Sequence, residues 1–247
     1  MTEPGTLSDD TLLGGRVRLR QPQHGYRVAI DPVLLAAAVP ARAGQHALDL
    51  GCGTGAAALC LASRVQGCSV TGLEKDTEAA RIARLNVAAN GLAERVQIIS
   101  GDAADPPAEI RRSFDLVMSN PPYLSDRAGT LPDISRRPAH VESLDLATWV
   151  AACLRRLHTG GWVTLIQRAD RLADLVSALH AGAGDVTVWP LWPRAGVAAR
   201  RVVVLARKGA RGPARLAAGL VLHRPDGGFT PEAEAIIRHG KAVEALA

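Results

Sequence analysis

Short apolar runs alternate along the chain with longer stretches in which apolar residues recur at helical spacing. Most of the runs are continuous, which is typical of parallel strands buried on both faces of a sheet. The stretches between them have the length of crossover helices. We expect strands at His46–Leu50, Ser69–Leu73, Val96–Ile99, Phe114–Met118, Trp162–Ile166, Val186–Leu191 and Arg201–Leu205, and helices at Ala56–Val65, Thr77–Asn90, Leu144–Leu157 and Leu172–His180.

This alternation predicts an α/β fold with a Rossmann-like, doubly wound sheet that is mostly parallel and ends in an antiparallel hairpin. A further helix should begin at Asp31-Pro32, because proline is favoured at the first helical position. Thr230-Pro231 has the same signature near the other end of the chain. Residues 1–11 are typical of a frayed leader, and Leu12–Leu19 of a small hairpin. We expect a leader and hairpin over 1–24, the main domain over 25–207, and an extension over 208–247 packed on the same domain.

Composition narrows the class of protein without identifying a function. The 247 residues, with 47% hydrophobic and 21% charged side chains, fit one α/β domain with additions and argue against disorder. A net charge of +5 permits a polyanionic partner. The four cysteines form no CxxC pair, and the first ten residues lack the basic and apolar regions of a signal peptide. We therefore expect a cytoplasmic protein with no membrane segment and no metal.

A glycine-rich turn, Asp49-Leu-Gly-Cys-Gly-Thr-Gly55, lies between the first of these strands and a helix. Gly51, Gly53 and Gly55 allow positive φ and let the backbone approach a ligand without a Cβ in the way. The spacing differs from the dinucleotide fingerprint, and Asp49 would repel a diphosphate but suits the ammonium of a methionine moiety. On its own, the loop is equally compatible with a turn that binds nothing.

Two more acidic residues follow the next two strands. Glu74 lies where a carboxylate accepts hydrogen bonds from ribose hydroxyls. Asp102, in Ser100-Gly-Asp-Ala103, lies where a side chain reaches an adenine amino group. Acidic residues at three successive strand ends favour a bound nucleoside cofactor over an empty turn.

The tetrapeptide Asn120-Pro121-Pro122-Tyr123 follows a fourth strand. A planar NH2 group is a poor nucleophile, because its lone pair is delocalised. Two acceptors aimed at its N–H groups, the Asn120 side-chain oxygen and the Pro121 carbonyl, stabilise the positive charge that develops on the nitrogen. Pro121 and Pro122 stiffen the backbone, and Tyr123 offers a flat face for a base. The alternative is a turn in which Tyr123 only packs.

The region over about residues 25–207 resembles the class I S-adenosylmethionine-dependent methyltransferases. The resemblance implies that S-adenosyl-L-methionine is the cofactor and S-adenosyl-L-homocysteine the product. It places the methionine part on the loop Asp49–Gly55, the ribose on Glu74 and the adenine at Asp102 and Ala103, with Asn120 beside the cofactor.

Enzymes with the Asn-Pro-Pro-Tyr pattern methylate the adenine N6, the guanine N2 or a glutamine side chain. Across most of its length the chain resembles the bacterial tRNA (adenine-N6)-methyltransferases, which act beside the anticodon of a valine tRNA. The resemblance lies in His24–Leu35, where the family has a cofactor-contacting segment that includes Asp31, in Arg137-Pro-Ala-His140, and in the stretch from Trp192–Gly196 to Lys208-Gly209. It implies a tRNA substrate, with His140 in the substrate loop. A glutamine in a protein such as a release factor, or another RNA base amine, stays open as the acceptor.

A basic segment near the C-terminus supports an RNA partner. Residues 194–215 contain no Asp or Glu, and a cluster of one sign neutralises phosphates. Among its cations, Arg194, Arg200 and Arg201 are the candidate RNA contacts. A solvated basic strand edge is the alternative for this segment. For the whole chain, an inactive cofactor-binding subunit and a small-molecule amine methyltransferase are the alternatives.

Overall fold

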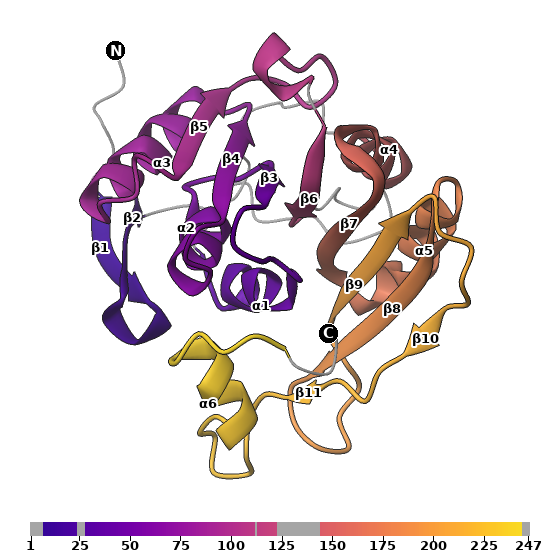
Figure 1. Cartoon of the computed structure of the whole chain (residues 1–247). Coiled ribbons are helices and arrows are strands. Elements are labelled where there is room, and N and C mark those ends of the chain that lie inside the picture. The colour runs from indigo at the N-terminus through magenta and orange to yellow at the C-terminus, as the bar shows by residue number, and fades with distance from the viewer. Residues whose placement is uncertain (1–6, 24–27, 112, 123–143, 244–247) are drawn as a thin grey trace, which may run out of the picture.

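The computed structural model describes residues 7–23, 28–111, 113–122 and 144–243. Its centre is one large sheet with helices on both faces (Figure 1), as the alternating pattern predicts. The sheet strands are β3 (His46–Leu50), β4 (Ser69–Glu74), β5 (Val96–Ser100), β6 (Phe114–Ser119), β7 (Leu157–Arg168), β8 (Ala183–Trp192), β9 (Arg201–Lys208), β10 (Arg215–Leu216) and β11 (Leu220–Val221). The helices are α1 (Asp31–Ala38), α2 (Ala56–Arg64), α3 (Thr77–Ala89), α4 (Leu146–Arg156), α5 (Leu172–His180) and α6 (Pro231–Ile237), with short 3-10 turns at Leu13–Gly15, Ala108–Ile110 and Ala169–Arg171.

The strands are hydrogen-bonded in the order β10-β8-β9-β7-β6-β3-β4-β5, and β11 also pairs with β8. Strands β3 to β7 are parallel to their neighbours within this group, and β9 runs antiparallel to both β7 and β8. The mostly parallel sheet and the antiparallel hairpin at its end are therefore confirmed. Because β4 lies on one side of β3 and β6 on the other, the strand order reverses at β3. Open α/β sheets bind ligands outside the carboxyl ends of the strands at such a point.

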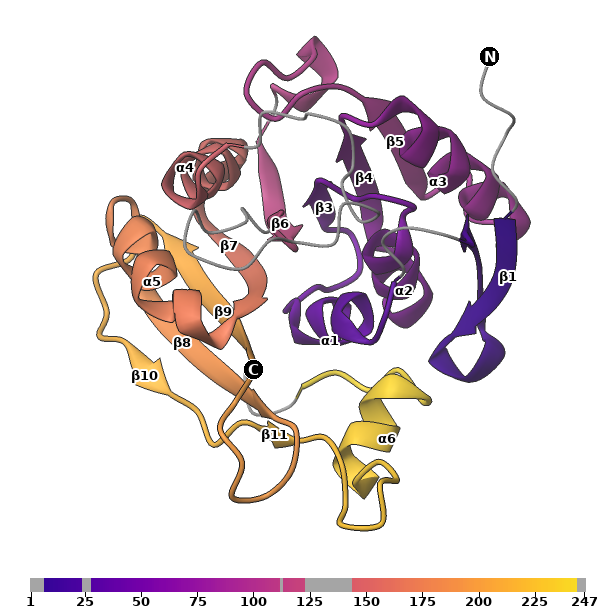
Figure 2. The same ribbon diagram turned by 180° about the vertical axis from the view of Figure 1, so that it is seen from behind.

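Burial on both faces explains why the strand segments are continuously apolar. In β9, Val203 and Leu205 pack in the core layer that contains α1, α2 and α3, whereas Val202 and Val204 pack in the layer with α4 and α5. Figure 2 shows α4 and α5 together beside β6 to β9. The two layers hold the sheet rigidly, so the loops at the strand ends are positioned by a fixed scaffold.

The N-terminal segment forms a second, two-stranded sheet. Strands β1 (Leu7–Leu12) and β2 (Val17–Pro22) pair antiparallel around the turn Leu13–Gly15. The hairpin is therefore longer than predicted, and the expectation of a leader as far as residue 11 is wrong from Leu7 onward. Asn86 of α3 and Asn90, which directly follows α3, bind the backbone of Arg20 and Arg18, so side-chain amides attach the hairpin to the main body.

The C-terminal segment returns to the body of the protein. Strands β10 and β11 pair with β8, and α6 begins at Pro231 after the cap residue Thr230, as predicted. The Val243 backbone N–H donates to the Ala37 carbonyl at 3.0 Å, which ties the end of this segment to α1. The division at residues 24 and 207 stays a prediction.

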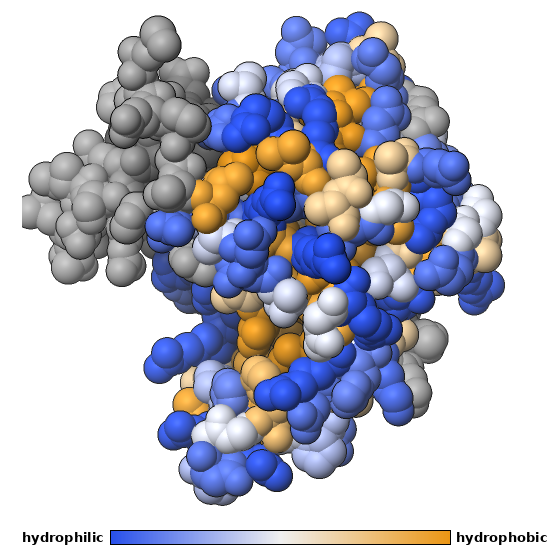
Figure 3. Space-filling model, turned by 90° about the vertical axis from the view of Figure 1, so that its left-hand side faces the viewer, coloured by the Kyte–Doolittle hydropathy of each residue, from blue (hydrophilic) through white to orange (hydrophobic). Residues whose placement is uncertain are grey.

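The face shown in Figure 3 is mainly hydrophilic, and hydrophobic residues appear on it as separate patches. Within the described ranges, no helix is both long and apolar enough to cross a bilayer.

Candidate active site

Two predicted site segments lie side by side because their strands are neighbours. β3 ends at Leu50 and β6 ends at Ser119, and these strands pair in parallel with Asp49 opposite Met118. The glycine loop therefore starts next to the point where Asn120 leaves the sheet. The strand order reverses at this place. The fold therefore brings the predicted cofactor loop close to Asn120, the residue predicted to accept hydrogen bonds from the amine.

The glycine loop has the backbone that its sequence predicts. Gly51, Gly53 and Gly55 have φ values of 73°, 55° and 86°, in the region that side chains other than glycine rarely adopt. A Cβ at Gly53 would meet nothing within 4 Å. At Gly51 it would lie 2.9 Å from the indole ring of Trp149. The loop thus leaves open space at its centre and is closed on one side by α4.

Asp49 is buried at the end of β3, and its Oδ2 atom has no hydrogen-bond partner among the described residues. Burial, opposed by a hydrogen bond from the Ala58 backbone and reinforced by the nearby Glu74 carboxylate, raises the pKa of this carboxyl from 3.8 to about 7. A buried carboxylate with a free acceptor atom suits a cationic ligand, because the cation supplies the missing partner.

Glu74 has a structural task that its sequence position did not reveal. Its Oε2 atom accepts from the Gly53 N–H and its Oε1 atom from the Asp76 N–H, both at 2.8 Å. The carboxylate therefore fixes the centre of the glycine loop while lying at the strand end expected for a ribose ligand.

Asp102 and Ala103 lie in the turn after β5. Asp102 forms an ion pair with Lys75 at 2.8 Å and accepts from the Ala104 N–H, and these contacts hold its pKa below the usual range. Ala103 is partly buried against the layer that contains α4. The turn is thereby ordered next to Glu74, at the edge where an adenine is expected.

Asn120 presents an acceptor atom with no partner. Its Oδ1 atom is buried and forms no hydrogen bond within the described residues. Pro121 is buried and Pro122 is exposed, so the backbone turns outward here. Tyr123 and His140 lie outside the described residues, so their predicted roles stay predictions. A buried amide oxygen without a hydrogen bond destabilises the folded protein. This indicates that a donor from a bound ligand forms a hydrogen bond with the Asn120 oxygen.

Sequence reasoning missed two residues that connect these segments. The Ser119 hydroxyl donates to the Leu50 carbonyl at 2.6 Å and accepts from the Trp149 indole N–H at 3.0 Å. Ser119 precedes Asn120 and Leu50 precedes Gly51, so this chain of bonds fixes the spacing between the two functional segments. Ser119 could have been noticed from its position, but no sequence signal indicates that α4 places Trp149 here.

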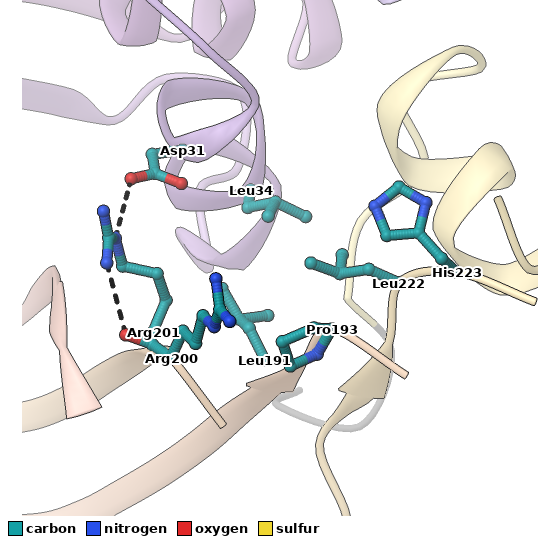
Figure 4. Close-up of a pocket in the computed structure, with 8 residues that line it drawn as sticks. All are labelled: Asp31, Leu34, Leu191, Pro193, Arg200, Arg201, Leu222 and His223. Carbon is teal, nitrogen blue, oxygen red and sulfur yellow. Dashed lines mark hydrogen bonds and ion pairs between the residues drawn. The ribbon is translucent and has the colours of Figure 1, made fainter. Parts of the chain in front are cut away.

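The predicted RNA contacts differ from one another in their surroundings. The Arg201 Nε atom lies 3.1 Å from the Asp31 carboxylate, so a predicted RNA residue is paired with a predicted cofactor residue (Figure 4). Arg194 and Arg200 are exposed, and their side chains form no ion pair with the described residues. These three arginines lie where β8 ends and β9 begins, beside the carboxyl end of β7.

The basic segment is not one patch. Arg207 and Lys208 lie at the far end of β9, and their side chains donate to the Gly160 and Leu157 carbonyls. Arg201 and Lys208 are the first and last of the eight residues of β9, and the strand between them is roughly 24 Å long. The idea of a single cluster over residues 194–215 is therefore wrong, because an extended strand carries its two halves to opposite edges of the sheet.

The chain matches known proteins over most of its length. The family model "Methyltransferase small domain" matches residues 27–137. The tRNA1(Val) (adenine(37)-N6)-methyltransferase of Aeromonas salmonicida is 36% identical over 74% of this chain and 77% of its own length. The protein of the same name from Tolumonas auensis is 30% identical over 86% and 88%. The chain belongs to the tRNA1(Val) (adenine(37)-N6)-methyltransferase family.

Other family members align over a shorter region. Two Porphyromonas gingivalis relatives of the same name are 41% identical, and the alignments span 66% and 61% of their length. Among solved structures, a protein described as a predicted O-methyltransferase from Agrobacterium tumefaciens has a TM-score of 0.72 and 26% identity, covering 86% of this chain and 97% of that one. The T. thermophilus 16S rRNA N2 G1207 methyltransferase, solved with AdoMet and guanosine, has a TM-score of 0.56 and 21% identity, covering 82% and 50%. Both likenesses agree with the predicted class I fold.

The cofactor of this methyltransferase family is S-adenosylmethionine, and the described residues fit it. The Asp49 oxygen without a partner can accept a hydrogen bond from the ammonium group of the methionine part. The space at Gly53 lets a ligand approach the backbone. The unpaired Asn120 oxygen lies at the adjacent strand end.

Proposed function

We propose that the chain transfers a methyl group from S-adenosylmethionine to the exocyclic N6 amine of an adenosine in tRNA. The observation that carries the proposal is the buried Asn120 Oδ1 atom, which has no partner among the described residues and lies next to the glycine loop. An adenine NH2 group supplies the donor that this atom lacks. The cofactor, when bound, supplies an electrophilic methyl group.

The chain's own residues accept hydrogen bonds from the amine and hold it in position for methyl transfer. The Asn120 side-chain oxygen and the Pro121 carbonyl accept the two amine N–H groups and favour a more tetrahedral nitrogen. As the nitrogen forms its new bond, positive charge grows on it, and the same acceptors stabilise that charge more strongly than they stabilise the ground state. The extra proton then leaves to solvent. Ser119 and Trp149 hold Asn120 at a fixed distance from the glycine loop, and such positioning contributes much of the rate enhancement.

The cofactor contacts within this proposal follow the strand ends. Asp49 and the glycine loop bind the methionine part, Glu74 the ribose, and Asp102 with Ala103 the adenine. The cofactor contact predicted for Asp31 stays a prediction, and its carboxylate also forms an ion pair with Arg201.

Two kinds of observation support tRNA as the substrate. The relatives from A. salmonicida, T. auensis and P. gingivalis all carry the name tRNA1(Val) (adenine(37)-N6)-methyltransferase. Arg194 and Arg200 are exposed and form no ion pair within the described residues. They lie at the same edge of the sheet as Asn120, where the parallel strands β6 and β7 end. A tRNA substrate also implies a cytoplasmic location. The remaining alternative is a glutamine side chain in a protein such as a release factor.

The test is to incubate the protein with isotopically labelled S-adenosylmethionine and, in separate reactions, tRNA, ribosomal RNA and release factors. We expect label only in tRNA, recovered as N6-methyladenosine after nuclease digestion and mass spectrometry. Label in the release factor alone, or in a guanosine, would overturn the assignment.

A further inference from the structure

A cavity of about 310 Å³ lies between the start of α1, the end of β8 and the segment that follows β11. This is within the size range of small-ligand sites, which are mostly apolar with a few polar groups. The apolar part of the lining comes from Leu34, Leu191, Pro193 and Leu222. The polar part comes from Asp31, His223, Arg201 at the start of β9 and Arg200 just before it, as Figure 4 shows.

The charge of the cavity is that of an anion site. Asp31 neutralises Arg201, and Arg201 also donates to the Arg200 carbonyl, so this pair forms a fixed wall. The Arg200 guanidinium points toward α1 beside Leu191 (Figure 4) and forms no ion pair with the described residues. The Arg200 guanidinium is therefore available to bind an anion. Guanidinium groups bind phosphates with two parallel hydrogen bonds.

The C-terminal extension completes the cavity. The Leu222 N–H donates to the Trp192 carbonyl at 2.8 Å, and the His223 N–H to the Pro193 carbonyl at 3.1 Å, so both residues are fixed against the end of β8. The His223 ring stacks on Phe229 with centroids 5.0 Å apart and planes 20° from parallel. A preoriented ring beside three leucines and a proline suits a flat, uncharged group such as a nucleobase.

The position of the cavity relates it to Asn120. Asn120 directly follows β6, and Leu191 belongs to β8. These two strands are three strand spacings apart in the sheet order, roughly 14 Å in total. The ends of β6, β7 and β8 lie at the same edge of the sheet. A few nucleotides of an extended single strand span this distance.

We propose that this cavity binds a nucleotide of the RNA strand that carries the methylated adenosine, a few positions away from it. Arg200 binds its phosphate, and the apolar lining with His223 receives its base. The inference rests on the proposed function and assigns substrate recognition to the C-terminal extension.

The test compares Arg200→Gln, which removes the cation, with Leu222→Trp, which fills the cavity, in the full-length protein. Arg200→Lys should restore the salt slope but only part of the affinity, because lysine keeps the charge and lacks the two parallel hydrogen bonds of a guanidinium. The matched control is Arg211→Gln, an exposed arginine in the half of the basic segment that lies away from the carboxyl ends of the strands. The measurements are KM and kcat for tRNA methylation, cofactor affinity, and tRNA affinity by filter binding across a salt series.

We expect Arg200→Gln and Leu222→Trp each to raise KM for tRNA about tenfold, with kcat and cofactor affinity unchanged. Arg200→Gln should also reduce the salt slope of tRNA binding by about 0.7 to 0.9. Arg211→Gln should match the wild type. If Leu222→Trp does not fold, Arg200→Gln and its lysine rescue decide the outcome.

The pocket and the proposed function fail in different ways. If the wild type methylates tRNA but the two variants keep its KM and salt slope, or Arg211→Gln loses as much, the pocket is refuted and the function stands. If the wild type leaves tRNA unmethylated, the function is refuted; the pocket then stands only if both variants still lower tRNA affinity. If instead the variants impair methylation of a release factor alone, the cavity binds protein and the RNA inference is wrong.

Discussion

Replacing Ser119 with alanine tests the link between the two functional segments. The change removes a hydroxyl that donates to the Leu50 carbonyl at 2.6 Å and accepts from the Trp149 indole at 3.0 Å. Ser119 is fully buried, so water does not replace it without rearrangement of the site. Both partners are left without this hydrogen bond.

The expected cost follows from the two groups that lose a partner. A buried donor or acceptor left unsatisfied costs about 1–3 kcal/mol. Trp149 is only partly buried, so its share lies at the lower end of that range. We expect a total loss of about 2–4 kcal/mol in the free energy of unfolding. For a chain of this size, that lowers the Tm by roughly 4–16 °C.

The next strand offers a matched control. Thr164 of β7 pairs with Met118, is equally buried, and its hydroxyl has no hydrogen-bond partner within the described residues. Thr164→Val keeps the shape and removes only an unpaired polar atom, so stability should be unchanged or increased.

Urea unfolding of the three proteins, followed by circular dichroism, measures the difference at constant m-value. The reasoning is refuted if Ser119→Ala and Thr164→Val have free energies of unfolding within about 0.5 kcal/mol of each other. Substitutions that remove no specific interaction usually change the free energy of unfolding by no more than this.

Three further predictions concern the glycine loop and the pH response. Glu74→Ala should weaken cofactor binding about ten- to a hundredfold by calorimetry while leaving the fold intact; unchanged affinity would contradict the placement of the ribose at Glu74. Because the pKa of Asp49 is about 7, cofactor affinity should fall as pH drops below that value, and Asp49→Asn should remove this dependence; an equal slope in both proteins would exclude Asp49 as the partner of the ammonium. Hydrogen bonds to the Thr159 carbonyl and to Asp115 raise the pKa of His158, so its stabilisation is fully present below the unfolded pKa of about 6.5 and is lost as pH rises through the higher folded value. His158→Gln should therefore cost up to about 1 kcal/mol at pH 5.5 and little at pH 9, and an equal loss at both pH values in urea unfolding would refute this account.

The sequence was sufficient to predict which segments meet at the candidate site. Carboxyl ends of parallel strands share one edge of a sheet, so Asp49, Glu74, Asp102 and Asn120 had to lie along that edge once their strands were recognised. The order of strands follows from the fold class that the alternation predicts. Local signals such as Asp31-Pro32 and Thr230-Pro231 also mark helix starts correctly.

Contacts between distant segments were beyond that reasoning. Trp149 reaches Ser119 only because of how α4 is rotated against the sheet, and Arg201 meets Asp31 across a sequence separation of 170. The basic segment was misjudged for a similar reason. Charges close in sequence were treated as close in space, although an extended strand separates Arg201 from Lys208.

The most direct test of the central claim is the single-turnover rate of Asn120→Ala with tRNA and S-adenosylmethionine both saturating. Asn120 acts mainly as charge develops on the nitrogen, so its loss should lower the methylation rate by at least about a hundredfold, with cofactor and tRNA affinities nearly unchanged. Full methylation rate in Asn120→Ala, measured as N6-methyladenosine formed per enzyme, would contradict the amine mechanism.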